Sequence, residues 1–506
     1  MKRRNFLRSV VATSALAALP GLPTLARIMH APDAGMGWIS APVNSNNNIL
    51  VVIRLFGGND GLNTLIPIHD DEYYRIRRDT ASVDMSIKAE STLPIPGTTE
   101  LAFHPSLKPL STLFNENKVA IVQGVGYPNM DLSHFRGTNI WLSASDSNVF
   151  ETTGWMGRFL ELRHHEKLES ATDPFAIEMG DKMGRAFVGM QTHMGITYET
   201  NTPIAEKVGL STENILGPDL EALIHRQAKD GKKFIRRTDS AVNSVPYGSG
   251  EYYNGPGNFG KSLRTISRSI RGGLTTQLYI VHTGQFDTHS NQQYDHAQQL
   301  DEMSTNVLAF QREMEEAGMA DRVSMLIMSE FGRRPAPKAT GTDHGTAAPV
   351  FVVGSSVNGG LYGVPPSVHD LNSDGNLHWH VDFRSIYASA LEQWFGDDPT
   401  TYLPSVLPRQ FPTIPLFRTP SSSLTSAQNV WPSPCSNTVN ISVTTGTTGP
   451  VRATITDMNG RPLRVYDAEV SGGAIQLNVS SVSQGMYVVQ LASGALQTSV
   501  PIIIRR

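Results

Sequence analysis

Cysteine is almost missing from this chain of 506 residues, which contains one, Cys435. A single cysteine excludes an intrachain disulfide framework and any metal site built from several thiolates. No run of about twenty apolar residues occurs beyond the N-terminal segment, so we expect no membrane span in the mature chain. Charged residues make up only 17% of the chain, while hydrophobic residues reach 39%. The composition therefore predicts an ordered globular protein rather than a disordered one.

An excess of basic residues is also absent. The formal net charge is −4, and Lys2, Arg3, Arg4 and Arg8 lie in a segment that we expect to be removed. Without these four, 38 basic residues face 46 acidic ones. Nucleic-acid binding favours basic surfaces, so this balance predicts no nucleic-acid partner.

The N-terminus, residues 1–26, is predicted to be an export signal. Arg3-Arg4-Asn-Phe-Leu7 resembles the twin-arginine motif, the stretch from Val10 to Leu19 is apolar, and Thr24-Leu-Ala26 is a small-residue cleavage site. Twin-arginine export moves folded proteins, which agrees with the lack of disulfides. We expect an exported protein at the cell surface or outside the cell, with residues 27–48 as a leader arm.

Residues 49–418 are predicted to form an α/β domain. Between Tyr294 and Met319, apolar residues recur at the spacing of a helix, and this segment lies between two apolar runs. The pattern predicts a β-α-β unit and hence a mostly parallel central sheet flanked by helices. A second amphipathic helix is expected at residues 382–395.

Polar clusters border four apolar runs of this domain. Three follow their run: Gly57-Gly-Asn-Asp60, Phe286-Asp-Thr-His289 and Ser329-Glu-Phe-Gly-Arg333. The fourth, Gly341-Thr-Asp-His-Gly345, precedes the run at 348–353. Open α/β sheets place their chemistry at the carboxyl ends of strands, so we expect these clusters to meet.

The clusters together predict a metal site. Their candidate ligands are Asp60, Asp287, His289, Glu330, Asp343 and His344. Hard divalent cations take oxygen ligands, and zinc and manganese also accept imidazole. We therefore predict one or two ions of zinc, manganese, magnesium or calcium. Each carboxylate taken singly is more typical of a helix cap or a loop, and only the conjunction favours a metal.

A small all-β sandwich is predicted at residues 428–506, after a linker at 419–427. Asn459-Gly460, between the strand-like runs at 451–456 and 463–466, indicates a hairpin. The segments Asn429–Pro434, Ile455–Arg461 and Gly485–Tyr487 resemble the C-terminal sorting domain of the type IX secretion system. Trp431 and Ser433 depart from that family's usual Tyr-Pro-Asn-Pro. The alternative is an accessory domain that binds carbohydrate or a protein partner.

Six motifs of the large domain, in chain order, resemble the exported family known as domain of unknown function 1501. They are Leu55–Thr64, Leu132–Phe135, Phe286–His289, Ser329–Arg333, Gly341–Gly345 and Asp382–Arg384. The family looks like a branch of the alkaline phosphatase and sulfatase superfamily. This resemblance implies an alkaline phosphatase-like sandwich fold. It also implies a metal-dependent hydrolase of phosphate or sulfate esters, with a small anionic ester as substrate and the export and sorting machinery as partners.

The resemblance also implies which residues hold the ions. Asp287 and His289 would bind one metal together with His344, while Asp60 and Glu330 would serve a second. That superfamily usually has Asp-His where this chain has Glu330-Phe331, and phenylalanine cannot bind a metal. The second ion would then be absent, weakly held, or completed by another residue, with His134 and Asp343 as candidates.

For catalysis, the resemblance implies Ser133 as a nucleophile at a helix start, and Arg333 with Arg136 as holders of the non-bridging ester oxygens. The alternatives are a helix N-cap for Ser133 and a salt bridge to the acidic cluster for Arg333. A different function also stays open: a non-catalytic, surface-displayed protein that binds a metal or another ligand on the same fold.

Overall fold

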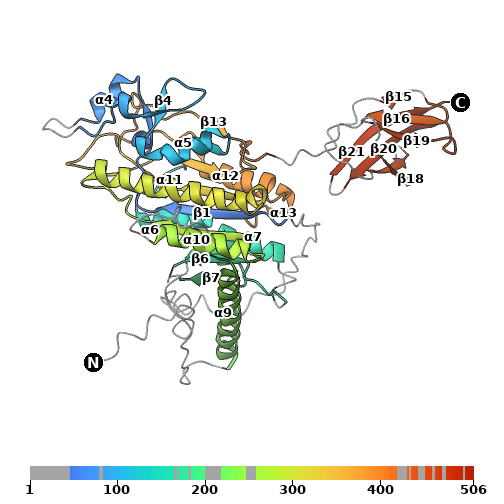
Figure 1. Ribbon diagram of the computed structural model, residues 1–506, viewed down its shortest axis with the longest axis horizontal. Helices are drawn as coiled ribbons and strands as arrows, with labels where there is room; N and C mark the ends of the chain where they lie inside the picture. Colours follow the sequence, from blue (N-terminus) through green and yellow to red (C-terminus); the bar gives the residue numbers. More distant parts are fainter. Residues whose placement is uncertain are drawn as a thin grey trace. The chain divides into compact units, whose positions relative to one another are not determined.

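The computed structural model describes residues 46–78, 84–164, 168, 170–180, 184–199, 218–246 and 258–418, and in the C-terminal part 430–431, 435–442, 451–457, 462–469, 474–493 and 496–505. The chain divides into two compact units between Phe417 and Arg418 (Figure 1). The predicted signal peptide, most of the leader arm, the linker and the Asn459-Gly460 turn lie outside the described residues.

A nine-stranded sheet forms the centre of the large unit. Its order is β13-β5-β12-β9-β1-β8-β6-β7, with β14 also paired to β5. The strands are β1 (Ile49–Leu55), β5 (Val119–Gly126), β6 (Ala176–Met179), β7 (Gly195–Tyr198), β8 (Leu278–Thr283), β9 (Val323–Met328), β12 (Ala348–Val353), β13 (Gly360–Tyr362) and β14 (Val381–Asp382). Strand β12 is antiparallel to both β9 and β5, whereas the other pairings in this sheet are parallel. The prediction of a mostly parallel sheet is confirmed.

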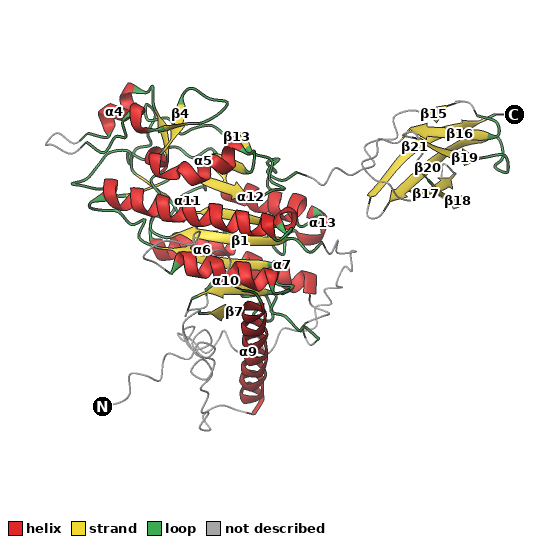
Figure 2. Cartoon of the chain, in the orientation of Figure 1, coloured by secondary structure: helices red, strands yellow, loops and turns green. Residues whose placement is uncertain are grey.

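Helices cover both faces of this sheet (Figure 2). One face packs against α5 (Lys108–Asn115), α10 (Phe259–Arg271) and α11 (Gln292–Glu316), and the other against α6 (His134–Ser143), α7 (Trp155–His164) and α12 (Phe383–Ser389). In β1, Val51 and Ile53 belong to the first core and Leu50 and Val52 to the second. Because successive side chains of a strand point to opposite faces, a strand covered on both sides reads as an unbroken apolar run.

The two helices expected from the sequence are present. Helix α11 connects β8 to β9, and β1 lies between these two strands in the sheet. The helix expected at 382–395 is α12, capped by the carboxylate of Asp382, which accepts from Arg384 N at 3.0 Å. A π-helical turn at Ala390–Trp394 continues it, a change of geometry that the apolar spacing did not indicate.

The remaining elements complete the large unit. They are helices α3 (Gly61–Thr64), α4 (Asp71–Ile76), α9 (Pro218–Ser244) and α13 (Pro399–Tyr402), 3₁₀ turns at Ala89–Ser91, Pro105–Leu107, Arg185–Phe187 and Ala320–Arg322, a sheet of β2 (Leu65–Pro67), β4 (Leu101–Phe103) and β3 (Leu93–Pro94), and the pair β10 (Gly332–Arg333) and β11 (His344–Gly345). None of the helices in the described parts of the chain combines the length and apolar character that a membrane crossing needs.

The C-terminal unit is all-β, as predicted. Its two antiparallel sheets have the orders β15-β16-β19 and β18-β17-β20-β21. The strands are β15 (Val430–Trp431), β16 (Thr438–Ser442), β17 (Val451–Thr456), β18 (Pro462–Ala468), β19 (Ala474–Asn478), β20 (Gly485–Ser493) and β21 (Leu496–Ile504). Alternating residues such as Val439, Ile441 and Ile455 fill the shared core, which also buries Cys435. The expected hairpin is the antiparallel pair β17 and β18.

Candidate metal centre

The loops after β1 and β8 touch at the carboxyl edge of the sheet. Phe286 N donates to Phe56 O at 3.0 Å, and the carboxylate of Glu330, just after β9, accepts from Gly57 N at 2.9 Å. Gly57 has φ +126°, and a Cβ there would come within 2.1 Å of the Asp287 nitrogen. Only glycine allows this approach, which explains the glycine at position 57.

Two imidazole nitrogens and one carboxylate oxygen form a tight triangle at this edge. Asp287 Oδ1 lies 3.0 Å from His289 Nε2 and 3.1 Å from His344 Nε2. The two Nε2 atoms lie 3.1 Å from each other. A third ring approaches the other oxygen, with His134 Nε2 at 3.3 Å from Asp287 Oδ2. Three histidines thus converge on one aspartate.

The opposite nitrogen of each ring faces an oxygen acceptor. His344 Nδ1 lies 2.7 Å from Leu132 O, His134 Nδ1 lies 2.8 Å from Glu330 Oε1, and His289 Nδ1 lies 3.3 Å from Asp343 Oδ1. A carbonyl or carboxylate oxygen can only accept, so Nδ1 carries the hydrogen and Nε2 of the neutral ring carries a lone pair. A ring whose second nitrogen donates to a carboxylate or carbonyl oxygen is typical of histidines that bind metals.

The donor set fits a divalent cation. Zinc binds imidazole and carboxylate at about 2.0–2.2 Å, which sets tetrahedral ligand atoms roughly 3.3 Å apart. The triangle of Asp287, His289 and His344 has sides of 3.0, 3.1 and 3.1 Å. Ligand atoms of His134, Asp287 and His344 also lie within 4.8 Å of one another. Among the described residues, the buried His134 Nε2 has no hydrogen-bond partner, so its lone pair can face a cation.

Arg333 holds the central carboxylate in place. Its buried guanidinium donates to Asp287 Oδ1 and also to three carbonyl oxygens: Gly58 at 3.0 Å, Gly57 at 2.6 Å, and Thr342. Burial opposes ionisation of Asp287, but the hydrogen bond and charge of Arg333 outweigh it and hold the pKa below its ordinary value. In this structure Arg333 forms a salt bridge with Asp287, which was the alternative role considered for it from the sequence.

Two predicted ligands lie behind the histidines. Glu330 is buried and accepts from both His134 and Gly57, so it orients His134 rather than facing the triangle. Asp343 lies between His289 and Lys338 Nζ, which is 2.9 Å away. Both carboxylates therefore contact the Nδ1 side of a histidine ring and do not face the converging Nε2 atoms.

Asp60 lies outside this group. It is fully buried, accepts from Arg77 Nη2 and Gln292 Nε2, and caps α3 by accepting from Asn63 N at 3.2 Å. Burial raises its pKa, yet the charge of Arg77 and the hydrogen bonds bring it below the ordinary value. The role of Asp60 as a ligand remains a prediction, and here its oxygens are taken by protein donors.

The remaining catalytic candidates lie at the start of α6. Ser133 is the exposed residue before the helix, and its side chain forms no capping hydrogen bond. Arg136 donates to the carbonyls of Ser147 at 2.7 Å and Val149 at 2.8 Å, and its guanidinium lies 4.2 Å from the Phe150 ring centre. Arg136 therefore fastens a loop in this structure.

His134 is the residue that sequence reasoning ranked too low. It entered only as a possible complement to a second ion, although it lies within the Leu132–Phe135 motif. Its ring packs between Phe56, at 5.3 Å between ring centres, and Phe331, at 5.0 Å. The presence of a histidine beside Ser133 was the available signal, and Phe331 contributes packing rather than ligation.

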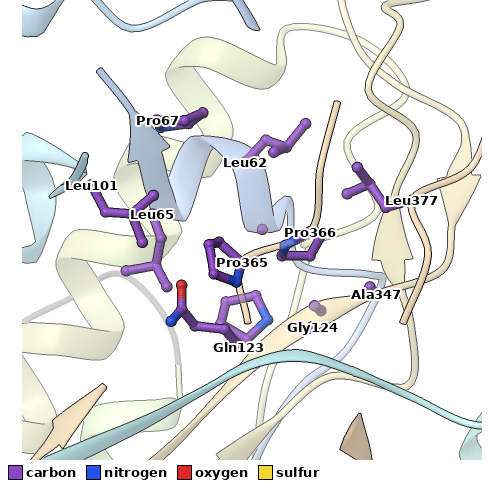
Figure 3. Close-up of a pocket in the computed structure, with 13 residues that line it drawn as sticks. Leu62, Leu65, Pro67, Leu101, Gln123, Gly124, Ala347, Pro365, Pro366 and Leu377 are labelled. Atoms are coloured by element: carbon purple, nitrogen blue, oxygen red, sulfur yellow. The ribbon is translucent and has the colours of Figure 1, made fainter. Parts of the chain in front are cut away.

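An apolar pocket lies elsewhere in the large unit (Figure 3). Leu62, Leu65, Pro365 and Leu377 line it, and Gln123 is a polar residue among the lining. None of the residues predicted for the site contributes to its wall.

Comparisons with known families agree with the sequence motifs. Residues 220–406 match the family described as "Protein of unknown function (DUF1501)". Residues 429–505 match the family described as "Secretion system C-terminal sorting domain". The first match contains four of the six motifs, and those around Asp60 and His134 precede it. Both predicted resemblances are confirmed, and the C-terminal domain marks the chain for the cell surface or the extracellular space.

Solved structures with a similar fold come from the alkaline phosphatase and sulfatase superfamily. A superfamily protein from Vibrio parahaemolyticus is 9% identical, with 84% of this chain and 82% of that chain covered and a TM-score of 0.34. The PsFucS1 sulfatase from Pseudoalteromonas sp. is 10% identical, with 86% and 84% covered and a TM-score of 0.31. An alkaline phosphatase from the Antarctic bacterium TAB5 is 9% identical, with 61% and 92% covered and a TM-score of 0.26. A comparison with curated proteins gave no match. At these TM-scores, no conclusion about the activity of this chain rests on the neighbours.

Proposed function

We propose that this exported protein is a metal-dependent hydrolase of phosphate or sulfate esters, with one divalent cation held by His134, Asp287, His289 and His344. The observation that carries the proposal is the convergence of three Nε2 atoms on one carboxylate, with each Nδ1 facing an oxygen acceptor. Three nitrogens and one oxygen favour zinc, or manganese, over magnesium and calcium, which prefer oxygen ligands.

The chain's own residues would prepare the site before any substrate arrives. Arg333 fixes the Asp287 carboxylate, and Glu330 and Leu132 O fix the rings of His134 and His344. When bound, a divalent cation supplies neutralisation of the anionic ester and activation of an attacking oxygen. Ser133, exposed and adjacent to His134, is the side chain that we propose as the nucleophile.

Metal content is the first test. The purified full-length chain, reloaded with zinc and desalted, should retain about one ion per chain by elemental analysis. Asp287→Asn and His344→Ala should lose it, because each removes a ligand from the triangle. His369→Ala is the matched control, since His369 lies on the surface beside Asp70 at 3.0 Å. Wild-type protein that retains no ion under these conditions would exclude the proposed centre.

Ester hydrolysis is the second test. The zinc-loaded protein should release phosphate or sulfate from aryl esters, and the Asp287→Asn variant should not. Equal rates for the two proteins would overturn the proposed activity.

A non-catalytic binding protein is the second candidate, because Arg333 and Arg136 are both engaged with protein acceptors in this structure. A chain that binds one ion but hydrolyses no phosphate or sulfate ester would support this candidate instead.

A further inference from the structure

Three ionisable side chains lie on one face of the sheet beside the metal centre. Arg54 of β1 lies opposite His282 of β8 in the sheet. Glu178 of β6 lies opposite Ile280, which is two residues before His282 on β8. The alternate residues of these strands belong to the core under α6, α7 and α12. Because side chains alternate along a strand, Arg54 points to the face that α6 covers.

The guanidinium of Arg54 has one hydrogen-bond acceptor among the described residues, the hydroxyl oxygen of Thr138, at 3.0 Å from Nη2. Glu178 is already engaged with His282, at 3.0 Å between Oε1 and Nε2. In the described parts of the chain, no carboxylate forms an ion pair with Arg54. A partly buried cation without a paired anion is costly, so the site favours an anion from outside the chain.

Arg54 lies next to the proposed metal ligands. Thr138 follows His134 by four residues on α6, which is about one helical turn, or roughly 6 Å along the helix. Phe56 lies two residues after Arg54, just beyond the end of β1, and its ring centre is 5.3 Å from that of His134. Glu330, which orients His134, and Glu178 both act on the charge of Arg54, but neither forms a direct ion pair with it among the described residues.

We propose that Arg54 holds the non-bridging oxygens of a tetrahedral oxyanion, the phosphate or sulfate group of the substrate, beside the metal centre. The inference rests on the proposed function and names the residue that recognises the anionic group. Thr138 fixes one nitrogen of the planar guanidinium, and the remaining N–H groups stay available for a forked contact with two oxygens. Arg333 lacks this freedom, because its nitrogens already serve Asp287 and three carbonyls.

Anion binding tests the proposal without ester turnover. Inorganic phosphate and sulfate are titrated into the zinc-loaded, full-length chain by calorimetry. Arg54→Gln should weaken binding of the preferred anion at least tenfold while the zinc content stays unchanged, and Arg54→Lys should retain part of it. Arg78→Gln is the matched control, because Arg78 is exposed and paired with Asp84. Equal affinity of wild type and Arg54→Gln overturns the proposal, as does a wild type that binds neither anion.

A second measurement covers the case in which Arg54→Gln does not fold. The preferred anion, phosphate or sulfate, should protect Arg54 of the wild-type chain from phenylglyoxal modification, followed by peptide mass spectrometry. Modification of Arg54 at an unchanged rate with both anions would also refute the inference. The results of these experiments distinguish a failure of the Arg54 proposal from a failure of the hydrolase proposal. If anions bind through Arg54 but no ester is hydrolysed, the role of Arg54 stands and the hydrolase proposal fails.

Discussion

Asp287 Oδ1 and His344 Nε2 lie 3.1 Å apart although the two residues are separated by 57 positions in the chain. Asp287 follows a strand of the parallel set, whereas His344 precedes β12, which is antiparallel to β9. The start of an antiparallel strand lies at the same sheet edge as the ends of its parallel neighbours. The reversed order of the fourth motif in the sequence is thus the consequence of one reversed strand.

Glu330 should control metal affinity through His134. Glu330→Ala removes the acceptor of His134 Nδ1 and leaves the ring free to turn, so we expect zinc affinity to fall by about 10–100-fold. Glu330→Gln keeps an oxygen acceptor and should lose less. A competition assay with a zinc chelator measures both. Loss of affinity that is no larger for alanine than for glutamine would contradict the orienting role.

Arg333 should matter for stability as well as for the site. Arg333→Met leaves the carbonyls of Gly57, Gly58 and Thr342 without their buried donor, and each unsatisfied group costs about 1–3 kcal/mol. We expect the free energy of unfolding in urea to fall by roughly 3 kcal/mol or more. Arg409→Gln is the control, because it removes an exposed ion pair to Asp146 that is worth about 1 kcal/mol or less. Similar losses for the two variants would refute this assignment.

Gly57→Ala should disrupt the loop contact that builds the centre. The new Cβ would lie 2.1 Å from the Asp287 nitrogen at φ +126°, so the loops after β1 and β8 must separate. We expect a lower melting temperature and a loss of bound zinc. At Gly273, with φ +81° and no atom within 4 Å of a new Cβ, alanine should cost only about 1–2 kcal/mol and leave zinc binding intact. Normal zinc content in Gly57→Ala would show that the close approach is dispensable.

Asp397 should make stability depend on pH. Burial raises the pKa of its carboxyl to about 6, although Arg163 opposes the shift. A raised folded-state pKa means that the folded chain favours the neutral acid, so this stabilisation is complete below about pH 4 and is lost as pH rises through 6. Asp397→Asn mimics the neutral form. Its melting temperature should exceed that of wild type at pH 7.5 and equal it near pH 4, measured by circular dichroism. If Asp397→Asn raised the melting temperature equally at pH 4 and pH 7.5, the ionisation of Asp397 would not be the cause.

Much of the fold could be predicted because burial leaves a local signature. The apolar runs that contain β1, β8, β9 and β12 were recognisable as strands, and the helical spacing between Tyr294 and Met319 corresponds to α11 (Gln292–Glu316). The centre was predictable in part for the same reason. Asp287, His289 and His344 follow or precede strands that end at one edge, and the structure brings all three together.

The roles of Asp60 and Arg333 depend on contacts with distant segments, which no local sequence pattern indicates. Asp60 was grouped with the ligands because it follows β1, but Arg77 and Gln292 engage its carboxylate. For Arg333 the sequence left two roles open, a contact with ester oxygens and a salt bridge, and the folding of the 329–345 segment brings Asp287 and three carbonyls to it. A side chain in the segment that follows a strand can turn either way, and its neighbours from distant segments decide which.

The order of apolar runs and polar motifs by itself determined the α/β class, the β-rich C-terminal domain and the edge where chemistry gathers, because hydrophobic periodicity is a local property of the chain. Tertiary structure alone decided which nitrogen of His134, His289 and His344 faces an oxygen acceptor, that His134 lies beside Asp287, and that Arg54 forms no ion pair among the described residues. Those outcomes depend on hydrogen-bond partners from separate strands and helices, and such partners are chosen only when the segments pack.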